Sequence, residues 1–195
     1  MKLMKKLAAV LLAGVLATAV LTGCGSDKNA VSTAKIADAM NQYAAVRGTG
    51  YTYTADSKLD TRATNIANAV ISTVKDDDFK GTKDYDFEKV IWNKAGAKIM
   101  ETVSDVPALA FGDKNKPAVL IEMTEVPASV KDEATLNAFY ASELMYSGGS
   151  GYIVNNKDGL SLSGHKEEKD WTMGTATCTV NGKKVLIVVY SFVLN

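Results

Sequence analysis

The C-terminal segment decides the fold of this chain: residues 175–194 read TATCTVNGKKVLIVVYSFVL. Up to Val180, threonine alternates with small or apolar residues, which is the period of a strand with two different faces. Asn181 and Gly182 follow, and these residue types readily adopt the positive φ angles of a type I′ turn. The segment therefore predicts a β-hairpin.

The returning strand of this hairpin, residues 185–194, is apolar at almost every position. A strand without a polar face must be covered on both sides, so we expect it in the middle of a sheet. Residues 117–124 contain another apolar run with β-branched members, which predicts a further strand. After the glycine-rich segment 147–151, residues 152–155 predict a short one.

Segments that precede the hairpin show apolar residues at helical spacing. The spacing predicts helices at residues 32–47, 57–74 and 84–95, with Ser57 in a capping box and Gly96 as the stop of the third helix. A fourth helix is expected after Ser129, with a bulky face made of Leu136, Phe139, Tyr140 and Leu144. Helices followed by strands indicate an α+β fold, with helices packed on a mainly antiparallel sheet that ends in the C-terminal hairpin.

The N-terminus carries a targeting signal. Lys2, Lys5 and Lys6 make its start positive, and residues 7–21 form an uninterrupted run of Leu, Ala, Val, Gly and Thr. This run is shorter than the ~20 residues that span a bilayer and has the length of a signal-peptide core. The alternative is an uncleaved membrane anchor with an incidental cysteine.

The segment Leu21-Thr22-Gly23-Cys24 resembles the lipobox of bacterial lipoproteins. The resemblance implies cleavage before Cys24 and attachment of a diacylglycerol to its thiol. It divides the chain into a signal peptide (residues 1–23), a lipidated tether (24–31) and a single extracytoplasmic domain (32–195). Each buried CH₂ contributes roughly 0.8 kcal/mol, and the two acyl chains of a diacylglycerol suffice for stable anchoring to the cell membrane.

Charge and cysteine counts limit what the mature chain can do. Cleavage removes three of the 22 basic residues and none of the 22 acidic ones, which leaves a net charge of −3. A mildly acidic body gives no reason to expect nucleic acid as a partner, because nucleic-acid binding needs clustered Lys and Arg. With Cys24 acylated, Cys178 is the only thiol, so no intramolecular disulfide can form and the core must hold the domain.

The sequence contains one histidine, His165, which removes every metal site that needs two or more imidazoles. The Gly-x-Ser-x-Gly elbow of serine hydrolases is also absent. Cys178 shares a strand face with small apolar residues, as inert core cysteines do. Asp76, Asp77 and Asp78 lack the ligand spacing of a calcium loop and indicate a solvated polar segment. We therefore expect no catalytic residue that the sequence can identify, no metal and no cofactor.

At the level of element order, the mature chain resembles the CAP superfamily, which includes cysteine-rich secretory proteins, antigen 5 and the pathogenesis-related 1 proteins. Two early helices, the segment Ser163-Gly164-His165 and the apolar C-terminal hairpin carry the resemblance. It implies that His165 corresponds to the second cavity histidine of that family. The first histidine is missing, so the resemblance is to a degenerate member without the metal cavity.

Together these features predict a membrane-anchored bacterial lipoprotein with a non-catalytic binding or interaction domain, possible ligands being a cell-envelope peptide, glycan or protein. His165 and Trp171 are the candidate ligand-binding residues, since an imidazole and an indole can contact a peptide or a sugar. The alternative is a cell-envelope hydrolase that acts on peptidoglycan or peptide through His165 or a carboxylate.

Overall fold

A computed structural model describes a large part of the predicted domain. The described residues are 31–83, 87–109, 116–130, 132, 136–140, 152–155 and 169–193. The predicted signal peptide, Cys24, the glycine-rich segment 147–151 and His165 lie outside them. The lipid-attachment residue and one of the two candidate ligand-binding residues therefore stay sequence-based predictions.

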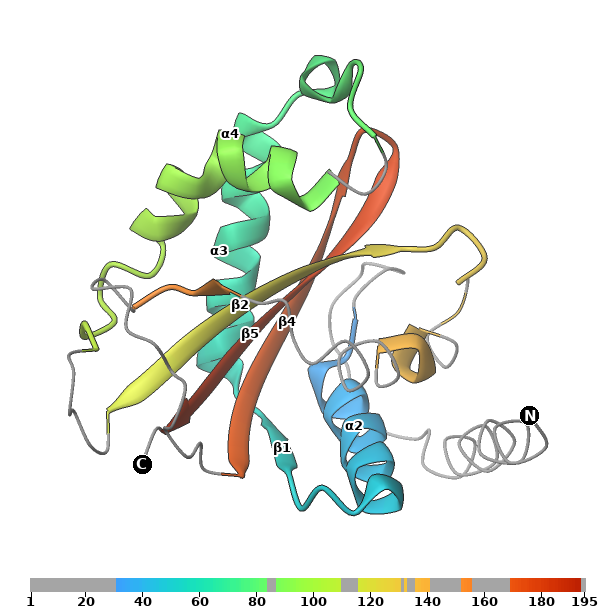
Figure 1. Ribbon diagram of the computed structural model, residues 1–195, viewed down its shortest axis with the longest axis vertical. Helices are drawn as coiled ribbons and strands as arrows, with labels where there is room; N and C mark the ends of the chain where they lie inside the picture. The colour runs from blue at the N-terminus through green and yellow to red at the C-terminus, as the bar shows by residue number, and fades with distance from the viewer. Residues whose placement is uncertain are drawn as a thin grey trace.

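Five strands form one sheet in the order β1-β4-β5-β2-β3 (Figure 1). β1 (Thr52–Ala55) runs parallel to β4 (Asp170–Val180). β5 (Lys183–Val193) is antiparallel to both β4 and β2 (Pro117–Val126), and β3 (Tyr152–Ile153) is antiparallel to β2. The predicted α+β class with a mainly antiparallel sheet is confirmed.

The C-terminal hairpin forms as its turn residues predict. Asn181 and Gly182 have φ angles of 50° and 71°, the positive values that a type I′ turn requires, and Val180 pairs with Lys183 across the turn. β5 then runs between β4 and β2, with both of its faces buried. The prediction of a central, fully covered return strand is confirmed.

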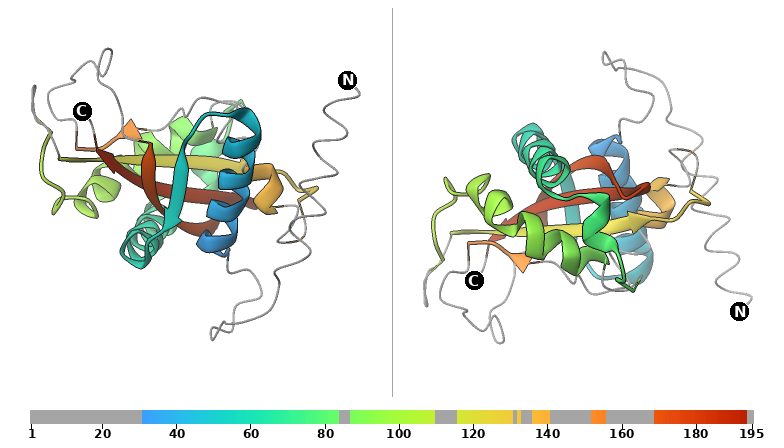
Figure 2. Two further views of the ribbon diagram at one scale, coloured as in Figure 1. Left: turned by 90° about the horizontal axis from the view of Figure 1, so that it is seen from below. Right: turned by 90° about the horizontal axis from the view of Figure 1, so that it is seen from above.

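Alternate side chains of β5 belong to two different hydrophobic cores, one on each face of the sheet. α3 (Ser57–Thr73) and α4 (Phe87–Glu101) supply the first core, and α2 (Thr33–Arg47) supplies the second. Figure 2 shows the strands crossing the middle of the molecule with helices along both sides. Residues 136–140 are helical, as predicted, and Tyr140 is fully buried in the core with α2.

The N-cap of α3 and the C-terminal end of α4 differ from their predictions. Asp56, not Ser57, is the N-cap of α3, and its carboxylate accepts a hydrogen bond of 2.8 Å from the Lys58 amide. α4 does not stop at Gly96 but continues to Glu101. An internal glycine costs a helix about 1 kcal/mol relative to alanine, and complete burial of Ile99 in the following turn outweighs this cost.

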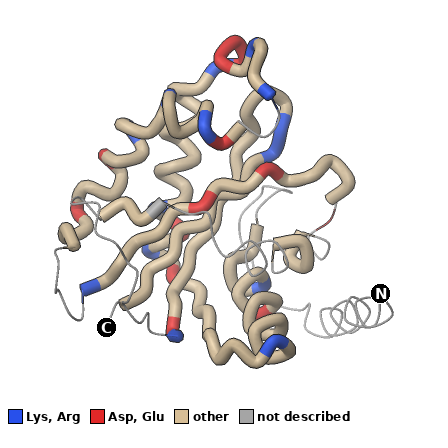
Figure 3. The backbone as a smooth tube through the Cα atoms, viewed as in Figure 1, with Lys and Arg blue, Asp and Glu red and all other residues tan. Residues whose placement is uncertain are grey.

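The acidic run after α3 forms a short 3₁₀ turn, η1 (Asp76–Phe79). α3 has already ended at Thr73, so the three carboxylates stay off the negative end of its dipole. Lys80 and Lys94 each approach one of them, Asp77 and Asp78 respectively, to 2.8 Å. Figure 3 shows this acidic turn at the top of the molecule with basic residues close by. The run is a partly ion-paired surface segment, as its sequence indicated.

Candidate functional site

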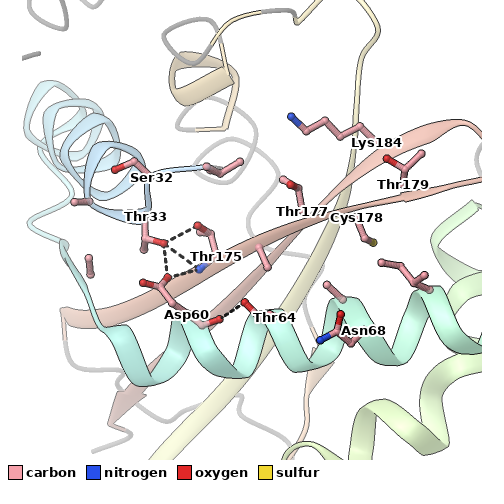
Figure 4. A pocket seen from close by; sticks show the side chains of 16 residues that line it. Ser32, Thr33, Asp60, Thr64, Asn68, Thr175, Thr177, Cys178, Thr179 and Lys184 are labelled. Atoms are coloured by element: carbon pink, nitrogen blue, oxygen red, sulfur yellow. Dashed lines mark hydrogen bonds between the residues drawn. The ribbon is translucent and has the colours of Figure 1, made fainter. Parts of the chain in front are cut away.

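A groove of about 990 Å³ runs along one side of β4, between the start of α2 and the length of α3 (Figure 4). Its described lining is rich in hydroxyl and amide groups. The polar residues that line it are Ser32, Thr33, Asp60, Thr64, Asn68, Thr175, Thr177, Thr179 and Lys184. A smaller hollow of about 340 Å³ adjoins the groove, and Ile71 and Thr179 line both.

α3 forms one wall of the groove because its two faces differ. Asp60, Thr64 and Asn68 recur every four residues, so they lie one above another along the groove side. Ala63 and Ile66 belong to the opposite side of the helix and are fully buried in the core. The amphipathic pattern that makes α3 pack on the sheet therefore also turns a polar stripe toward the groove.

A hydrogen-bonded cluster of Thr33, Asp60 and Thr175 lies in the lining of the groove (Figure 4). The Thr33 hydroxyl donates to the Asp60 carboxylate and lies 2.6 Å from the Thr175 hydroxyl. The Thr175 amide donates to Asp60 Oδ1 at 2.9 Å and to Thr33 Oγ1 at 3.2 Å. These contacts join α2, α3 and β4, which are far apart in the sequence.

Gly174 allows α3 to approach β4 closely enough for this cluster to form. A Cβ atom at this position would lie 2.0 Å from the carbonyl carbon of Leu59 and 2.2 Å from the amide nitrogen of Asp60. Backbone atoms cannot yield that much space, so only glycine fits here. The close approach places the Asp60 carboxylate beside the amide of the next residue, Thr175.

The chemistry of the groove is that of hydrogen bonding. Asp60 is the only carboxylate among its described lining residues, and it already accepts hydrogen bonds from Thr33 and Thr175. Lys184 provides a positive charge in the lining. Within the described residues there is no group of three or more His, Cys, Asp and Glu side chains that could hold a metal ion. The lining is suited to contacting polar groups of a ligand.

Cys178 touches the groove but behaves as a core residue. Its side chain is buried in the core with α3 and α4, as the alternation of β4 predicted. Burial raises the pKa of the Cys178 thiol to about 11, so the thiol stays protonated at neutral pH. A protonated, buried thiol is a poor nucleophile.

Trp171 lies outside the lining of the groove, in an aromatic group on the α2 side of the sheet. Its ring stacks on Phe192 at a centroid distance of 4.1 Å and makes edge contacts with three tyrosines: Tyr51, Tyr53 and Tyr190. These contacts give the half-buried indole a packing role. A ligand contact by Trp171 stays a prediction.

A buried carboxylate lies elsewhere in the sheet. Glu122 on β2 is 6% exposed, and its burial, together with the nearby negative charge of Glu88, raises the pKa of Glu122 to about 7. In the register, Leu120 pairs with Tyr190 and Glu122 with Val188, so Glu122 is a diagonal neighbour of Tyr190. Glu122 is not among the residues that line the groove.

The sequence reasoning missed the groove and β1. Tyr51-Thr52-Tyr53-Thr54 alternates aromatic residues with threonine, which is a strand signal that could have located β1. The isolated glutamate in the apolar run of β2 could likewise have identified Glu122 as a buried acid. The cluster of Thr33, Asp60 and Thr175 has no local signature, because its members meet only in the folded chain.

Comparisons with protein-family models, with curated proteins and with solved structures found no match. In the described part of the chain, no helix has both the length and the apolar character needed to cross a membrane. The resemblance to the CAP superfamily thus stays an expectation from the sequence.

Proposed function

We propose that the protein is a bacterial lipoprotein, attached through a diacylglycerol on Cys24 to the extracytoplasmic face of the cell membrane, whose α+β domain binds a cell-envelope ligand in the groove beside β4. The lipobox Leu21-Thr22-Gly23-Cys24 supports the anchor. A degenerate CAP-like character of the domain is part of the proposal and rests on Ser163-Gly164-His165.

The groove is the observation that carries the binding function. It offers hydroxyl and amide groups from α3 and β4, together with the ammonium group of Lys184. Val31, at the end of the proposed tether, also lines it. A ligand in the groove would therefore be held beside the segment that leads to the membrane, which suits a protein that captures envelope material near its anchor.

The composition of the groove favours binding over hydrolysis. A hydrolytic site needs a nucleophile or an activated water next to a general base. Here the described carboxylate is hydrogen-bonded within the protein, and the described thiol is protonated and buried. The alternative hydrolase would use His165 or a carboxylate, and Asp60 is the only one of these groups among the described residues that line the groove.

Replacement of Cys24 by Ala tests the anchor. We expect the full-length protein to move from the membrane fraction to the soluble extracytoplasmic fraction, because the acyl chains hold it at the bilayer. Cys178→Ala is the matched control, since it removes the other thiol and leaves the lipobox intact; it should stay in the membrane fraction. Retention of a processed Cys24→Ala protein in the membrane would overturn the proposed anchor.

Replacement of Asn68 by Trp tests the groove. Asn68 and Asn65 are both exposed on α3, but only Asn68 lines the groove. The detergent-solubilised full chain is titrated with peptidoglycan fragments and envelope-derived peptides, and the mixtures are analysed by mass spectrometry. We expect reversible binding that falls at least tenfold in Asn68→Trp and stays within twofold in Asn65→Trp, without cleavage of the probe.

Two results of this titration contradict the proposal. Binding that is equal in the two tryptophan variants would place the ligand outside the groove. Cleavage of a probe that is lost in His165→Ala would establish the hydrolase instead.

A further inference from the structure

Part of β4 has a free edge, along which no other described strand is paired. β1 pairs with β4 only from Asp170 to Met173, and within the described residues no strand continues this pairing along positions 174–180. On its other side, β4 is paired with β5 through Val180. The sheet therefore has an open edge where β4 borders the groove.

The direction of the backbone groups at this edge follows from the register. The Thr52 amide donates to the carbonyl oxygen of Lys169, directly before β4, and the Asp56 amide donates to that of Met173 in β4, each at 2.8 Å. Odd-numbered residues thus face the β1 side, and even-numbered residues face β5. Thr175 follows the same rule, because its amide points outward to Asp60.

Asp60 accepts the hydrogen bond of the first outward amide beyond β1, that of the buried Thr175, and five further outward groups follow along the strand. They are the Thr175 carbonyl and the amide and carbonyl groups of Thr177 and Thr179. No hydrogen bond from another described residue to these five groups is found. Thr177 and Thr179 both line the groove and are at least partly exposed. Donors and acceptors that alternate in this way match the backbone of one more extended strand.

The open stretch lacks the features by which proteins usually protect a strand edge. The other outer strands in the described sheet, β1 and β3, have four and two residues and are short in themselves. In contrast, positions 175–179 of β4 contain no proline and no charge, and three of the five are β-branched threonines. The wall formed by α3 leaves a groove beside this edge, which suits a single extended segment.

We infer that the groove binds an extended segment of another polypeptide, which adds to the sheet as a strand along Thr175, Thr177 and Thr179. This inference rests on the proposed function, because it names the ligand class of the same groove. Main-chain hydrogen bonds supply affinity in this mode of recognition, and pockets for alternate side chains supply specificity. The open stretch spans about 13 Å at ~3.3 Å per residue, the length of about five residues of the ligand.

Ile71 and Lys184, which line the groove, indicate which side chains of a ligand can be bound there. Ile71 is 51% exposed and lies between the groove and the adjoining hollow, so an apolar side chain of the ligand can cover it. Lys184 pairs in register with Thr179 and lines the groove, so an acidic side chain of the ligand can contact it, whereas the adjoining hollow is lined by Lys75, Asp76 and Asp77. The tether itself is a poorer occupant, because Gly25, Ser26, Asp27 and Asn29 are weak strand formers.

The test uses the detergent-solubilised full chain and an array of eight-residue peptides of random sequence. Thr177→Pro removes an outward amide without removing a hydrogen bond to β5. We expect peptides with an apolar and an acidic residue to bind, and binding to weaken at least tenfold in Thr177→Pro. Binding should stay within twofold in the control Asn65→Ala, because Asn65 is exposed on α3 and does not line the groove. Thermal unfolding of both variants shows whether each is folded.

A second measurement keeps the test valid even when Thr177→Pro does not fold. The best peptide is N-methylated at alternate amides in two sets, and each set is titrated against the unmodified protein. We expect one set to lose at least tenfold in affinity and the other to bind within twofold of the parent, because a strand presents only alternate amides to its neighbour.

Four outcomes overturn the inference. One is the absence of any binding peptide. Another is equal loss, or no loss, in the two methylated sets. The third is self-association of the protein, measured by sedimentation, that Thr177→Pro abolishes, since this would make a second copy the occupant. Binding of a peptidoglycan fragment that responds to Asn68→Trp but not to Thr177→Pro would remove the strand-addition mode and leave the proposed function intact.

Discussion

The two halves of β4 have the same backbone conformation but different surroundings. From Asp170 to Met173, the strand is paired with β1, and from Thr172 onward it is also paired with β5. Trp171 and Met173 pack in the core with α2. From Thr175 to Thr179, it is paired only with β5 and borders the groove. A strand lies on each side of the first half, whereas the second half has β5 on one side and the cluster around Asp60 and the wall formed by α3 on the other. A binding edge can therefore exist on a stable strand.

The largest expected effect comes from the junction of the two halves. Gly174→Ala places a methyl group 2.0 Å from the Leu59 backbone, so α3 must move away from β4. We expect a loss of more than about 3 kcal/mol in the free energy of unfolding, measured by denaturant titration, because overpacking against backbone is among the costliest substitutions. Gly96→Ala in α4 is the control and should change stability by no more than about 1 kcal/mol, in the stabilising direction. Equal stability of Gly174→Ala and the parent would show that α3 does not lie so close.

The next effect concerns the pH dependence of stability and distinguishes two carboxylates. Glu122 is buried in the sheet, whereas Asp60 at the groove is hydrogen-bonded. The pKa of Glu122 is raised from 4.5 to about 7 in the folded state, so the folded protein binds this proton more tightly than the unfolded chain. Its contribution to stability is fully present below pH 4.5 and falls as the pH rises through 7.

Glu122→Gln removes this titration. We expect the variant to exceed the parent in unfolding free energy by about 3 kcal/mol at pH 8 and to match it near pH 4. Denaturant titrations across this range measure the difference, and the other carboxylates cancel in the comparison. A difference that does not change with pH would contradict the assigned burial of the Glu122 charge.

A smaller effect is expected at the cluster of Thr33, Asp60 and Thr175. Asp60→Ala and Thr33→Val each remove an acceptor of the Thr175 amide, and we expect losses of about 1–2 kcal/mol for each. Both residues accept a hydrogen bond from the same amide. In a double-mutant cycle, the loss of unfolding free energy in the double variant should therefore differ from the sum of the two single losses by at least about 0.5 kcal/mol. Strict additivity would mean that the two side chains act independently.

The smallest effect is expected at the open half of the strand. Thr179 is exposed, and its outward-facing backbone amide and carbonyl have no partner among the described residues. The unfolding free energy of Thr179→Ala should therefore stay within about 0.5 kcal/mol of that of the parent. Met173→Ala in the covered half should cost about 2–5 kcal/mol, because this side chain is fully buried. Similar losses for the two variants would remove the distinction between the halves.

Local patterns predicted most of the fold. The hairpin was predictable because Asn181 and Gly182 determine a turn type within two residues, and the apolar run of β5 indicates its central position. The ends of the helices were less predictable. α4 continues beyond Gly96 because Ile99 is buried, and burial depends on residues that are distant in the sequence. The candidate ligand residues showed the same limit, since Trp171 packs against other aromatic rings and His165 lies outside the described residues.

The sequence by itself determined the periodicities of helices and strands, the hairpin turn and the lipobox-like segment, because each depends on residues that are close together in the chain. Only the tertiary structure decided that Thr33, Asp60 and Thr175 share one hydrogen-bonded cluster and that half of β4 stays open beside α3. The physical reason is that hydrogen bonds, burial and strand pairing depend on distances in space, which residues separated by up to 142 positions acquire only on folding.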